Sequence, residues 1–379
     1  MPANVAIVGY GLRYVVNLWA VSHRSNTDTL NSAKVFHIPL IRALPDVYKI
    51  HGIVQRSPKP DDNAEKDYPG TKAYRSIDEA LQDSDVDVVV ITSIPETHFD
   101  MCKSALQAGK HVVVEKPFVP TAAEADELCE IAKKSGKKLA VYQNRRWDAD
   151  FVTLKQVIAS GSLGDISEFE THFDRHRPDP PADSWKAKDV AGNGAIYDLG
   201  THLIDQVYSL FGSPERVTGF VGVQRRGVTE GAHDSCTVLL HYDGGKLLVT
   251  AKAGVVSPEV DQLRFWVRGT KGGFKKFHLD PQEDQLKVAK AGAALPEDFG
   301  IEADGRAATV TTLGEGGKLD RKVWETVSPP PTYVEYYRVF GKALAGEGEV
   351  PVKAEEARDV LKIIEAVLQS SKEGKTITL

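Results

Sequence analysis

The chain has 379 residues, of which 41% are hydrophobic and 26% charged; this balance predicts two globular domains and excludes disordered and fibrous proteins. The net charge of −6 provides no positive field, so we expect neither a nucleic-acid nor a membrane partner. Three widely spaced cysteines exclude a disulfide framework, and without a secretion signal or a bilayer-spanning run the expected location is cytoplasmic.

Residues 1–146 alternate short Val/Ile-rich runs with helical patterns. This alternation is typical of parallel βαβ units with strands buried on both faces, so we predict an α/β domain. The expected strands are Val5–Val8, Ile50–Val54, Val86–Ile91, His111–Val114 and Leu139–Tyr142. The expected helices are Ser76–Gln82, Thr97–Ala108 and Thr121–Lys134, the last with a capping-box signature at its start and Gly136 at its end.

Residues 147–379 follow a different pattern. After one expected helix at Phe151–Ser160, long alternating runs indicate an open, largely antiparallel sheet with one covered face, so we predict an α+β domain. The expected strands are Glu168–Phe173, Val217–Val223, Thr237–Tyr242, Leu247–Ala251 and Gln262–Val267. A wide sheet that exposes Trp and Phe side chains needs a partner, so we expect a homodimer or higher homo-oligomer through this sheet.

The rest of this second part is less regular. We expect loops around short strands over 271–331, which is rich in Gly, Asp and Lys. A final amphipathic helix is expected at Ala354–Ser370, because Val360, Leu361, Ile364, Val367 and Leu368 fall on one stripe.

The first expected strand runs into Gly9-Tyr10-Gly11, the first two glycines of a dinucleotide-binding fingerprint. Glycine there permits a tight turn and lets the backbone approach a pyrophosphate at the amino end of a helix. Two glycines alone are a weak signal, and the third position falls on the bulky Tyr14, where helix and strand should pack closely. Taken literally, the fingerprint is broken.

An unusually long connection accounts for this break. Forty-one residues separate Val8 from Ile50, which is long for one helix with two short loops. Removing residues 13–31 restores a complete Gly-x-Gly-x-x-Ala and shortens the separation to twenty-two residues. We interpret 13–31 as an insertion or as a translated retained intron, since the codons available at its ends permit splice sites in matching phase. The predicted pyrophosphate turn is then Gly9, Gly11, Leu12 and Ala33.

Three further motifs, in their order and spacing, are specific to one family. They are Glu115-Lys116-Pro117 at a strand end, Gln143-Asn144-Arg145-Arg146-Trp147, and Gly194-Ala195-Ile196-Tyr197-Asp198-Leu199-Gly200-Thr201-His202. On these motifs the chain resembles the glucose–fructose oxidoreductase/inositol dehydrogenase (Gfo/Idh/MocA) family over nearly its whole length, and within it the scyllo-inositol dehydrogenase-like branch. The resemblance implies an amino-terminal Rossmann NAD(P)-binding domain, a carboxy-terminal substrate-binding and oligomerisation domain, and redox chemistry at a carbinol of a sugar or polyol.

The resemblance also implies catalytic residues. Hydride transfer from an alcohol needs a base for the hydroxyl proton and positive charge near the developing alkoxide. Lys116 matches the family's lysine between nicotinamide and substrate, and a cis bond is implied at Pro117. His202 matches the family's general base, and Asp198 matches the residue that orients substrate or histidine. The alternatives are a surface lysine and a helix-surface ion pair at i,i+4 spacing, and a metal site at this pair lacks a third ligand.

Cofactor preference depends on the end of the second strand, where an acidic residue would bind the adenosine ribose and disfavour a 2′-phosphate. Arg56 and Ser57 occupy that place, so NADP is favoured over NAD, with an Arg56 that merely faces water as the alternative. His98 is interpreted as an ordinary helix-start residue. The other expected cofactor contacts are Thr92, Ser93, Pro95, Glu115, Lys116 and Asn144.

The expected substrate contacts are Lys116, Arg146, Trp147, Asp198 and His202. A structural crossover role is the alternative for both Asn144 and Arg146. His172, Asp174 and His176 alternate as strand residues do, so they either line the cleft or form a solvated charged face.

The sequence thus predicts an NADP(H)-dependent oxidoreductase that moves a hydride between the nicotinamide and a carbinol of a sugar or cyclic polyol. A rival from a different class is a non-catalytic dinucleotide-binding regulator or scaffold, because function does not follow from fold. Within the class, the alternative is a dihydrodiol or aldose dehydrogenase.

Overall fold

The computed structural model describes residues 1–10, 14–16, 28–30, 32–60, 62–179, 188–228, 231–289 and 293–379. The chain forms two compact units, each assembled from separate stretches of sequence. The first contains Met1–Asn144, Gln282–Phe299 and Thr332–Arg358, and the second contains Arg145–Pro281, Gly300–Pro331 and Asp359–Leu379. Among the described helices, none is both long and apolar enough to cross a membrane.

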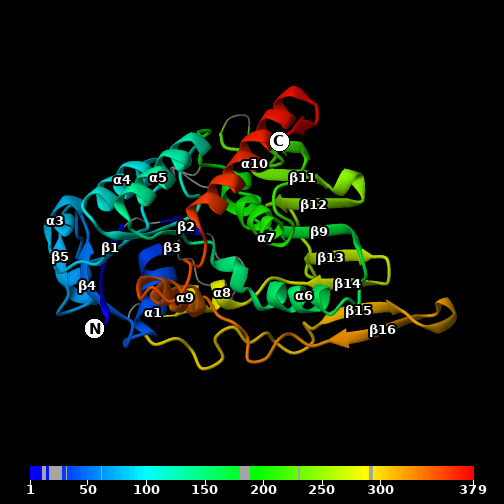
Figure 1. Ribbon diagram of the computed structural model, residues 1–379, viewed down its shortest axis with the longest axis horizontal. Helices are drawn as coiled ribbons and strands as arrows, with labels where there is room; N and C mark the ends of the chain where they lie inside the picture. Colours follow the sequence, from blue (N-terminus) through cyan, green and yellow to red (C-terminus); the bar gives the residue numbers. More distant parts are fainter. Residues whose placement is uncertain are drawn as a thin grey trace. The chain divides into compact units, whose positions relative to one another are not determined.

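The first unit is built on a six-stranded parallel sheet (Figure 1). In spatial order its strands are β5 (Lys72–Tyr74), β4 (Tyr48–Val54), β1 (Ala3–Val8), β6 (Val88–Ile91), β7 (His111–Val114) and β8 (Leu139–Val141). All five predicted strands are present, and the predicted Rossmann-like α/β fold is confirmed. The strand order reverses beside β1, and in open sheets of this kind ligands bind beyond the carboxyl ends of the strands at that point.

Most helices of the first unit lie in the connections between these strands, while α8 (Gln282–Val288) and α9 (Val334–Leu344) come from the later stretches of the chain that join this unit. The others are η1 (Ala33–His37), α1 (Ile38–Arg42), α2 (Ala64–Asp67), α3 (Ile77–Gln82), η2 (Pro95–Thr97), α4 (His98–Gln107) and α5 (Ala122–Ser135). The predicted capping box is confirmed, because the Thr121 side chain accepts a hydrogen bond from the Glu124 N–H while the Glu124 side chain accepts one from the Thr121 N–H. Within residues 13–31, β2 (Tyr14–Val16) and β3 (Asp28–Leu30) pair as antiparallel strands.

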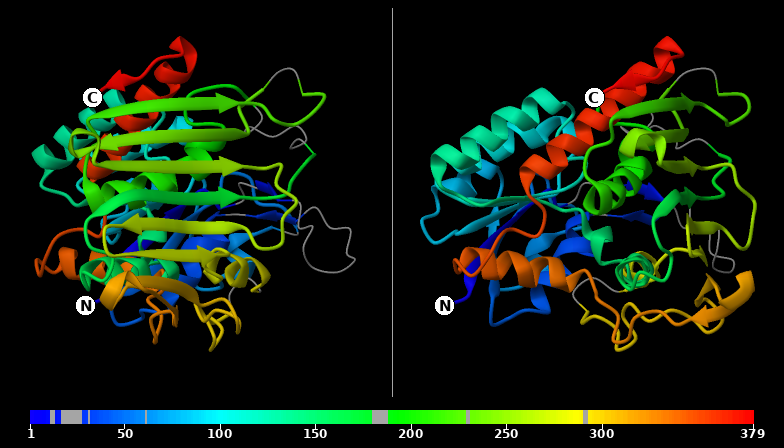
Figure 2. Two further views of the ribbon diagram at one scale, coloured as in Figure 1. Left: turned by 90° about the vertical axis from the view of Figure 1, so that its right-hand side faces the viewer. Right: turned by 45° about the vertical axis from the view of Figure 1, so that its right-hand side comes forward.

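The second unit contains a nine-stranded sheet, seen face-on in the left view of Figure 2. Its order is β16 (Leu319–Trp324), β15 (Ala308–Leu313), β14 (Gly272–Phe277), β13 (Leu263–Gly269), β9 (Ile166–Asp174), β12 (Leu247–Gly254), β11 (Ser235–Tyr242), β10 (Arg216–Gly222) and β17 (Ile377–Thr378). Every neighbouring pair is antiparallel except β9 with β12, which confirms the predicted open, largely antiparallel sheet.

Helices pack on one face of this sheet. They include η3 (Asn144–Trp147), α6 (Ala149–Ala159), η5 (Ile196–Gly200), α7 (Thr201–Phe211) and α10 (Ala354–Glu373), with short turns at η6 (Asp243–Gly245) and η7 (Glu315–Gly317). The rings of Phe169 and Phe265 meet edge to face under this layer, at 5.9 Å between centroids. The region 271–331, expected to hold loops around short strands, contains three six-residue strands that widen the sheet, and also the helix Gln282–Val288, which was not predicted.

Candidate active site

The turn after β1 requires glycine at position 9. Gly9 has a φ of +105°, a conformation that side chains other than glycine rarely adopt. A Cβ atom built on Gly9 would lie 2.7 Å from the Thr92 hydroxyl oxygen and 2.8 Å from the Thr92 carbonyl. Only glycine therefore fits between the ends of β1 and β6. Gly11 and Leu12 lie outside the described residues, while Ala33 is fully buried at the start of η1.

The loop after β6 carries three predicted cofactor residues. The Thr92 hydroxyl donates to the Val8 carbonyl at 2.8 Å, which ties this loop to the end of β1. The Thr97 hydroxyl donates to the Ser93 hydroxyl at 2.7 Å, and the buried Pro95 begins η2. These polar and small side chains are held in a fixed turn at the switch point of the sheet.

Beside this loop, His98 is fully buried and bridges two loops, which the sequence interpretation missed. Its Nε2 lies 3.0 Å from the Ser93 carbonyl, and its Nδ1 lies 3.1 Å from the carbonyls of Pro117 and Phe118. Burial lowers the pKa of His98, and its contacts with these carbonyl groups oppose that shift. His98 thereby links the loop after β6 to the loop after Lys116.

Arg56 and Ser57 follow β4 and are both exposed, at the place predicted to recognise the adenosine ribose. The preceding Gln55 is buried, where it accepts from the Ala64 N–H at 2.9 Å and donates to the Asp62 carbonyl at 2.8 Å. The Gln55 side chain thus joins the two ends of the loop between β4 and α2, which fixes the backbone that carries Arg56.

Glu115 and Lys116 follow β7 directly. Glu115 is buried and Lys116 is half-buried, and the Lys116–Pro117 bond is cis, as predicted. One oxygen of the Glu115 carboxylate accepts from the Ser32 hydroxyl and lies 2.9 Å from His37 Nε2, while the other accepts from the Lys116 N–H at 3.0 Å. Burial opposes ionisation of this carboxyl, but its contacts with His37 and Ser32 prevail and hold the pKa of Glu115 below its usual value.

The predicted proton-transfer residues lie in the second unit on η5 and α7. Asp198 is half-buried on η5, and His202 is buried on α7, where its ring packs against Phe173 with centroids 6.3 Å apart. Residues 196–200 form a π-helical turn, so the simple α-helical face argument for Asp198 and His202 does not hold. A π-turn has more than four residues per turn, and such turns are frequent at functional sites.

The start of η5 is held by His233, whose contribution the sequence interpretation also missed. The Ala195 N–H donates to the His233 carbonyl at 2.8 Å, and the Ile196 N–H lies 3.3 Å from His233 Nε2. Gly194 has a φ of +90°, and a Cβ there would lie within 2.7 Å of the His233 ring. Glycine is therefore required where the Gly194–His202 motif begins.

The segment after β8 contacts α7 through main-chain and side-chain groups. Arg146 forms a two-pronged ion pair with the buried Asp205, at 2.9 and 2.8 Å. The Gln206 side chain donates to the Arg145 carbonyl at 2.6 Å. The guanidinium of Arg146 is thus engaged with the helix that carries His202, while Asn144 and Trp147 are half-buried on η3.

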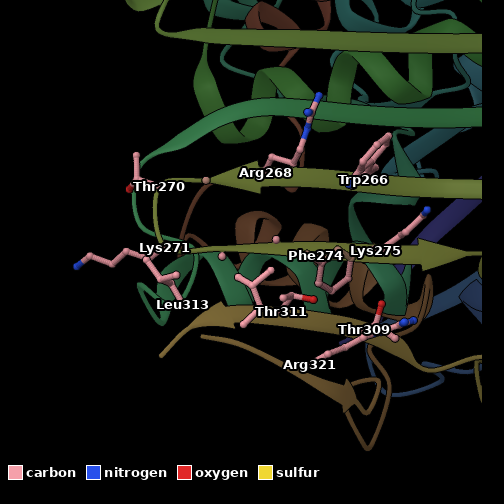
Figure 3. Close-up of a pocket in the computed structure, with 14 residues that line it drawn as sticks. Trp266, Arg268, Thr270, Lys271, Phe274, Lys275, Thr309, Thr311, Leu313 and Arg321 are labelled. Carbon is pink, nitrogen blue, oxygen red and sulfur yellow. The ribbon is translucent and has the colours of Figure 1, made fainter. Parts of the chain in front are cut away.

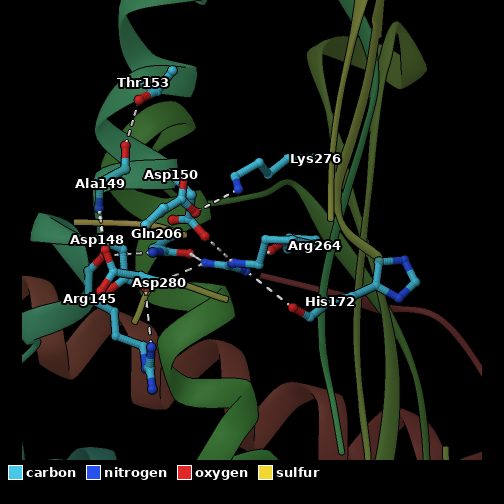
Figure 4. A network of polar contacts seen from close by, with 12 residues as sticks. Arg145, Asp148, Ala149, Asp150, Thr153, His172, Gln206, Arg264, Lys276 and Asp280 are labelled. Carbon is cyan, nitrogen blue, oxygen red and sulfur yellow. Dashed lines mark hydrogen bonds and ion pairs between the residues drawn. The ribbon is translucent and has the colours of Figure 1, made fainter. Parts of the chain in front are cut away.

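A buried polar network supports the same helix (Figure 4). The Arg264 guanidinium, on β13, contacts Asp150 at 3.0 Å and the Gln206 side chain at 2.7 Å. It also donates to the Thr171 hydroxyl at 2.9 Å and to the His172 carbonyl at 3.2 Å. Arg264 is 1% exposed, so these contacts replace the water that a charged group would otherwise bind.

His172 and Asp174 lie on the other face of β9. Their side chains are 3.2 Å apart, and Glu170 on the same face lies opposite Trp266 of β13. Phe173, which packs against His202, points to the helix-covered face. His172 and His202 therefore lie on opposite sides of the sheet.

A dinucleotide fits the described residues of the first unit. The bare Gly9 turn, the fixed hydroxyl-bearing loop at Thr92 and Ser93, and the polar groups at Arg56 and Ser57 all follow carboxyl ends of parallel strands. This is the arrangement by which Rossmann domains take up a pyrophosphate and its flanking riboses.

Comparison with known proteins agrees with this geometry. A family model described as "Oxidoreductase family, NAD-binding Rossmann fold" matches residues 3–143, and one described as "GFO/IDH/MocA C-terminal domain" matches residues 151–275. The yvaA protein of Bacillus subtilis, a solved structure, superposes with a TM-score of 0.86 at 33% identity, covering 99% of this chain and 98% of its own.

Two curated relatives match over most of the chain. The uncharacterized oxidoreductase C115.03 of Schizosaccharomyces pombe is 39% identical over 362 residues, covering 92% of this chain and 96% of its own. The protein named scyllo-inositol 2-dehydrogenase (NADP(+)) IolW, of Bacillus subtilis, is 34% identical over 382 residues, covering 99% of this chain and 96% of its own. The chain therefore belongs to the Gfo/Idh/MocA family of oxidoreductases, with an NAD-binding Rossmann domain at its amino-terminal end.

Proposed function

We propose that this chain is an NADP(H)-dependent oxidoreductase that interconverts a carbinol and a carbonyl of a sugar or cyclic polyol. The observation that carries the proposal is the Lys116 position, directly after β7 at the binding edge of the parallel sheet. The name of the relative IolW, a scyllo-inositol 2-dehydrogenase (NADP(+)), supports the substrate class.

Each proposed residue has a chemical task. Lys116 donates to the substrate oxygen and stabilises the negative charge that develops on it. His202 exchanges the hydroxyl proton through its imidazole, which suits transfer near neutral pH, and Asp198 orients the substrate or this histidine. Gly9, Thr92, Ser93 and the residues after β4 hold the dinucleotide, which supplies a hydride acceptor at the nicotinamide ring.

Alanine variants at Lys116 and His202 test these roles. We expect turnover of scyllo-inositol with NADP⁺ to fall by about 10²-fold or more in each variant, the usual contribution of one proton-transfer group. NADPH affinity, measured by fluorescence titration, should stay close to that of the parent chain. Full turnover in both variants would refute the assignment. An intact chain that binds NADPH, but neither oxidises any polyol with NADP⁺ nor reduces any carbonyl sugar with NADPH, favours the regulator or scaffold.

The fingerprint turn is tested by a pair of glycine variants. Gly9→Ala brings a Cβ against Thr92 and should weaken NADPH binding about tenfold or more, since overpacking costs about 1–3 kcal/mol. Gly70→Ala is the matched control, because its φ of +89° is equally unusual but the space around it is open. Equal NADPH affinity in the two variants would count against a pyrophosphate at Gly9.

The proposed preference for NADP rests on Arg56 and Ser57. A guanidinium pairs with a 2′-phosphate, and no carboxylate directly follows β4 to repel it. Arg56→Ala should therefore weaken NADPH binding by about tenfold while leaving NADH binding unchanged, because only NADPH carries that phosphate. Equal losses for both cofactors would instead place Arg56 outside the ribose site.

The status of residues 13–31 is tested by deleting them. We propose that this segment is an insertion or a translated retained intron between Leu12 and Ser32. The chain that lacks Arg13–Asn31 carries a complete fingerprint and should bind NADPH at least as tightly as the full chain. If both forms bind NADPH and NADH with the same preference, the segment is a tolerated loop. If the mature messenger RNA always contains the segment, it is not a retained intron.

A second copy of the chain is the proposed partner of the open sheet face. A groove of about 510 Å³ on β13–β16 is lined by residues that include Trp266, Arg268, Lys275 and Arg321 (Figure 3). The neighbouring strand β9 presents Glu168 and Glu170, so the face carries both signs of charge and can pair with itself about a two-fold axis. Light scattering should give the parent chain the molar mass of a dimer or a higher oligomer. Trp266→Glu should lower that mass to half or less, and a monomeric parent chain would contradict the proposal.

A further inference from the structure

Glu115 joins two elements of the first unit that carry different parts of the proposed site. Glu115 is buried and follows β7 directly, immediately before Lys116. One oxygen of its carboxylate takes up Ser32 and His37, from the helix that begins with the fingerprint's Ala33, and the other accepts from the Lys116 N–H. The carboxylate therefore spans from the cofactor helix to the main chain of the lysine.

His37 is held on its other side by aromatic residues. Its Nδ1 lies 2.5 Å from the Tyr337 hydroxyl, and its ring packs against Tyr142 with centroids 4.3 Å apart. The Tyr142 hydroxyl donates to the Phe36 carbonyl at 2.9 Å, and the Tyr48 hydroxyl donates to the Tyr337 carbonyl at 2.7 Å. His37 has no exposed surface, so its ring has little freedom to turn.

Such a cluster contributes more to geometry than to stability. Burying a charged or polar pair costs desolvation that its mutual attraction offsets only when every group is matched, and apolar side chains of similar size would pack as well. Here both ring nitrogens and both carboxylate oxygens have partners at directed distances. What the polar groups add is one fixed orientation of η1 relative to the end of β7.

We propose that His37 and Glu115 are positioning residues that fix the Lys116 side of the site against the cofactor-binding helix. The inference rests on the proposed role of Lys116. It assigns a task to a histidine whose position in the sequence gives no sign of one, and it makes the geometry of the lysine depend on the docking of η1.

Two substitutions at His37 separate its contacts. Glutamine places its amide nitrogen near the position of Nε2 and keeps a donor toward Glu115, while asparagine mimics Nδ1 and keeps only the contact with Tyr337. His37→Gln should therefore behave as the parent chain, and His37→Asn should release the Glu115 carboxylate. Glu115→Gln removes the carboxylate that His37 and Ser32 contact, and Ser32→Ala removes the hydroxyl contact to it.

The readout is the chemistry of Lys116 itself, which needs no substrate. The full chain is pulse-labelled with a succinimidyl ester at fixed pH, and the Lys116 peptide is quantified by mass spectrometry. We expect labelling about tenfold faster in His37→Asn and Glu115→Gln, because losing a hydrogen bond to a charged group shifts a local opening equilibrium by about that factor. His37→Gln should restore the parent rate.

His111→Gln is the control, since His111 lies at the opposite end of the same strand and its Nδ1 accepts from the Lys138 N–H at 3.0 Å, a contact that glutamine, which mimics Nε2, does not keep. It should lower the melting temperature without changing the labelling of Lys116. Unchanged labelling in both His37→Asn and Glu115→Gln would overturn the inference, as would equal labelling of the asparagine and glutamine variants. Should His37→Asn fail to fold, Glu115→Gln and Ser32→Ala decide by the same criterion.

Turnover measured in parallel distinguishes this inference from the proposed function. With NADP⁺ and scyllo-inositol, His37→Asn should lower kcat about tenfold or more with KM and NADPH affinity nearly constant, because small displacements of a catalytic group cost up to about 10²-fold. A fully active Lys116→Ala contradicts the proposed function alone. An inactive Lys116→Ala beside a fully active His37→Asn contradicts the positioning role alone.

Discussion

The helices that carry the fingerprint alanine and His202 begin in the same way but are held differently. Each opens with a five-residue π-helical turn, Ala33–His37 in the first unit and Ile196–Gly200 in the second, and then continues as an α-helix. The first helix continues for only five residues and is docked by one carboxylate, Glu115. The second continues for eleven and is held by two arginines.

The difference shows how length decides the means of docking. An eleven-residue helix buries enough side chains for packing to fix it, and the contacts of Arg146 and Arg264 with its buried Asp205 and Gln206 add to that packing. A five-residue helix offers few side chains, and its placement depends on the directed bonds of Ser32 and His37. We expect the second helix to tolerate a single polar loss at its periphery better than the first.

The largest effect should come from the centre of the second network. Arg264→Met keeps the volume but leaves the buried Asp150 carboxylate and Gln206 without their partner, so the free energy of unfolding should fall by about 3–5 kcal/mol. Arg268→Met, on the same strand but 45% exposed and paired with Glu168, should cost less than about 1 kcal/mol. Denaturant titration measures both, and equal losses would show that the buried network does not hold α7.

An intermediate effect is expected at the first helix, with a pH signature. Because the folded pKa of Glu115 lies below its ordinary 4.5, its contribution to stability is present above that pH and is lost as the pH falls through the lowered folded value. Glu115→Gln should lower the melting temperature at pH 7, costing about 2–3 kcal/mol, and should flatten its decline below about pH 4.5. The exposed Glu355→Gln is the control. If the melting temperature of Glu115→Gln falls with decreasing pH as steeply as that of the parent chain, Glu115 does not contribute to the acid sensitivity of this unit.

The smallest effect should come from the edge of the second network. Arg146→Lys keeps the charge beside Asp205 but replaces a two-pronged contact with one bond, so it should cost about 1 kcal/mol. Thermal melting of this variant should therefore fall between those of Arg268→Met and Arg264→Met. A loss as large as that of Arg264→Met would show that α7 is as dependent on single contacts as η1 and α1 are.

Local patterns in the sequence were sufficient for much of the fold. Val/Ile runs predicted five of the six parallel strands of the first unit, because burial of both faces selects apolar residues along the whole strand. The alternation within Gln262–Val267 predicted the antiparallel strand Leu263–Gly269, because burial of one face gives a period of two. The cis bond before Pro117 was implied by family resemblance and is confirmed. Strands β14–β16 could be predicted only as short strands without bounds, because glycines and charged residues interrupt their alternation.

The supporting groups of the candidate site could not be read from the sequence. His37 meets Glu115 across 78 positions and Tyr337 across 300, so no local pattern signals that its ring is buried and paired. His98 resembles any residue at a helix start, yet it links two loops through carbonyl groups. The π-turns depend on one extra residue in a helical turn, and no residue type marks them.

The two edge strands of the nine-stranded sheet differ in length, and this difference affects how readily the protein aggregates. One edge is the two-residue β17, too short to recruit another strand. The other is β16, six residues long, with Leu319 and Val323 exposed and Asp320, Arg321 and Lys322 between them. Charges placed on an edge strand oppose edge-to-edge growth. Replacing those three with neutral residues, or screening them with salt, should therefore promote fibrillar assembly before any loss of the native fold.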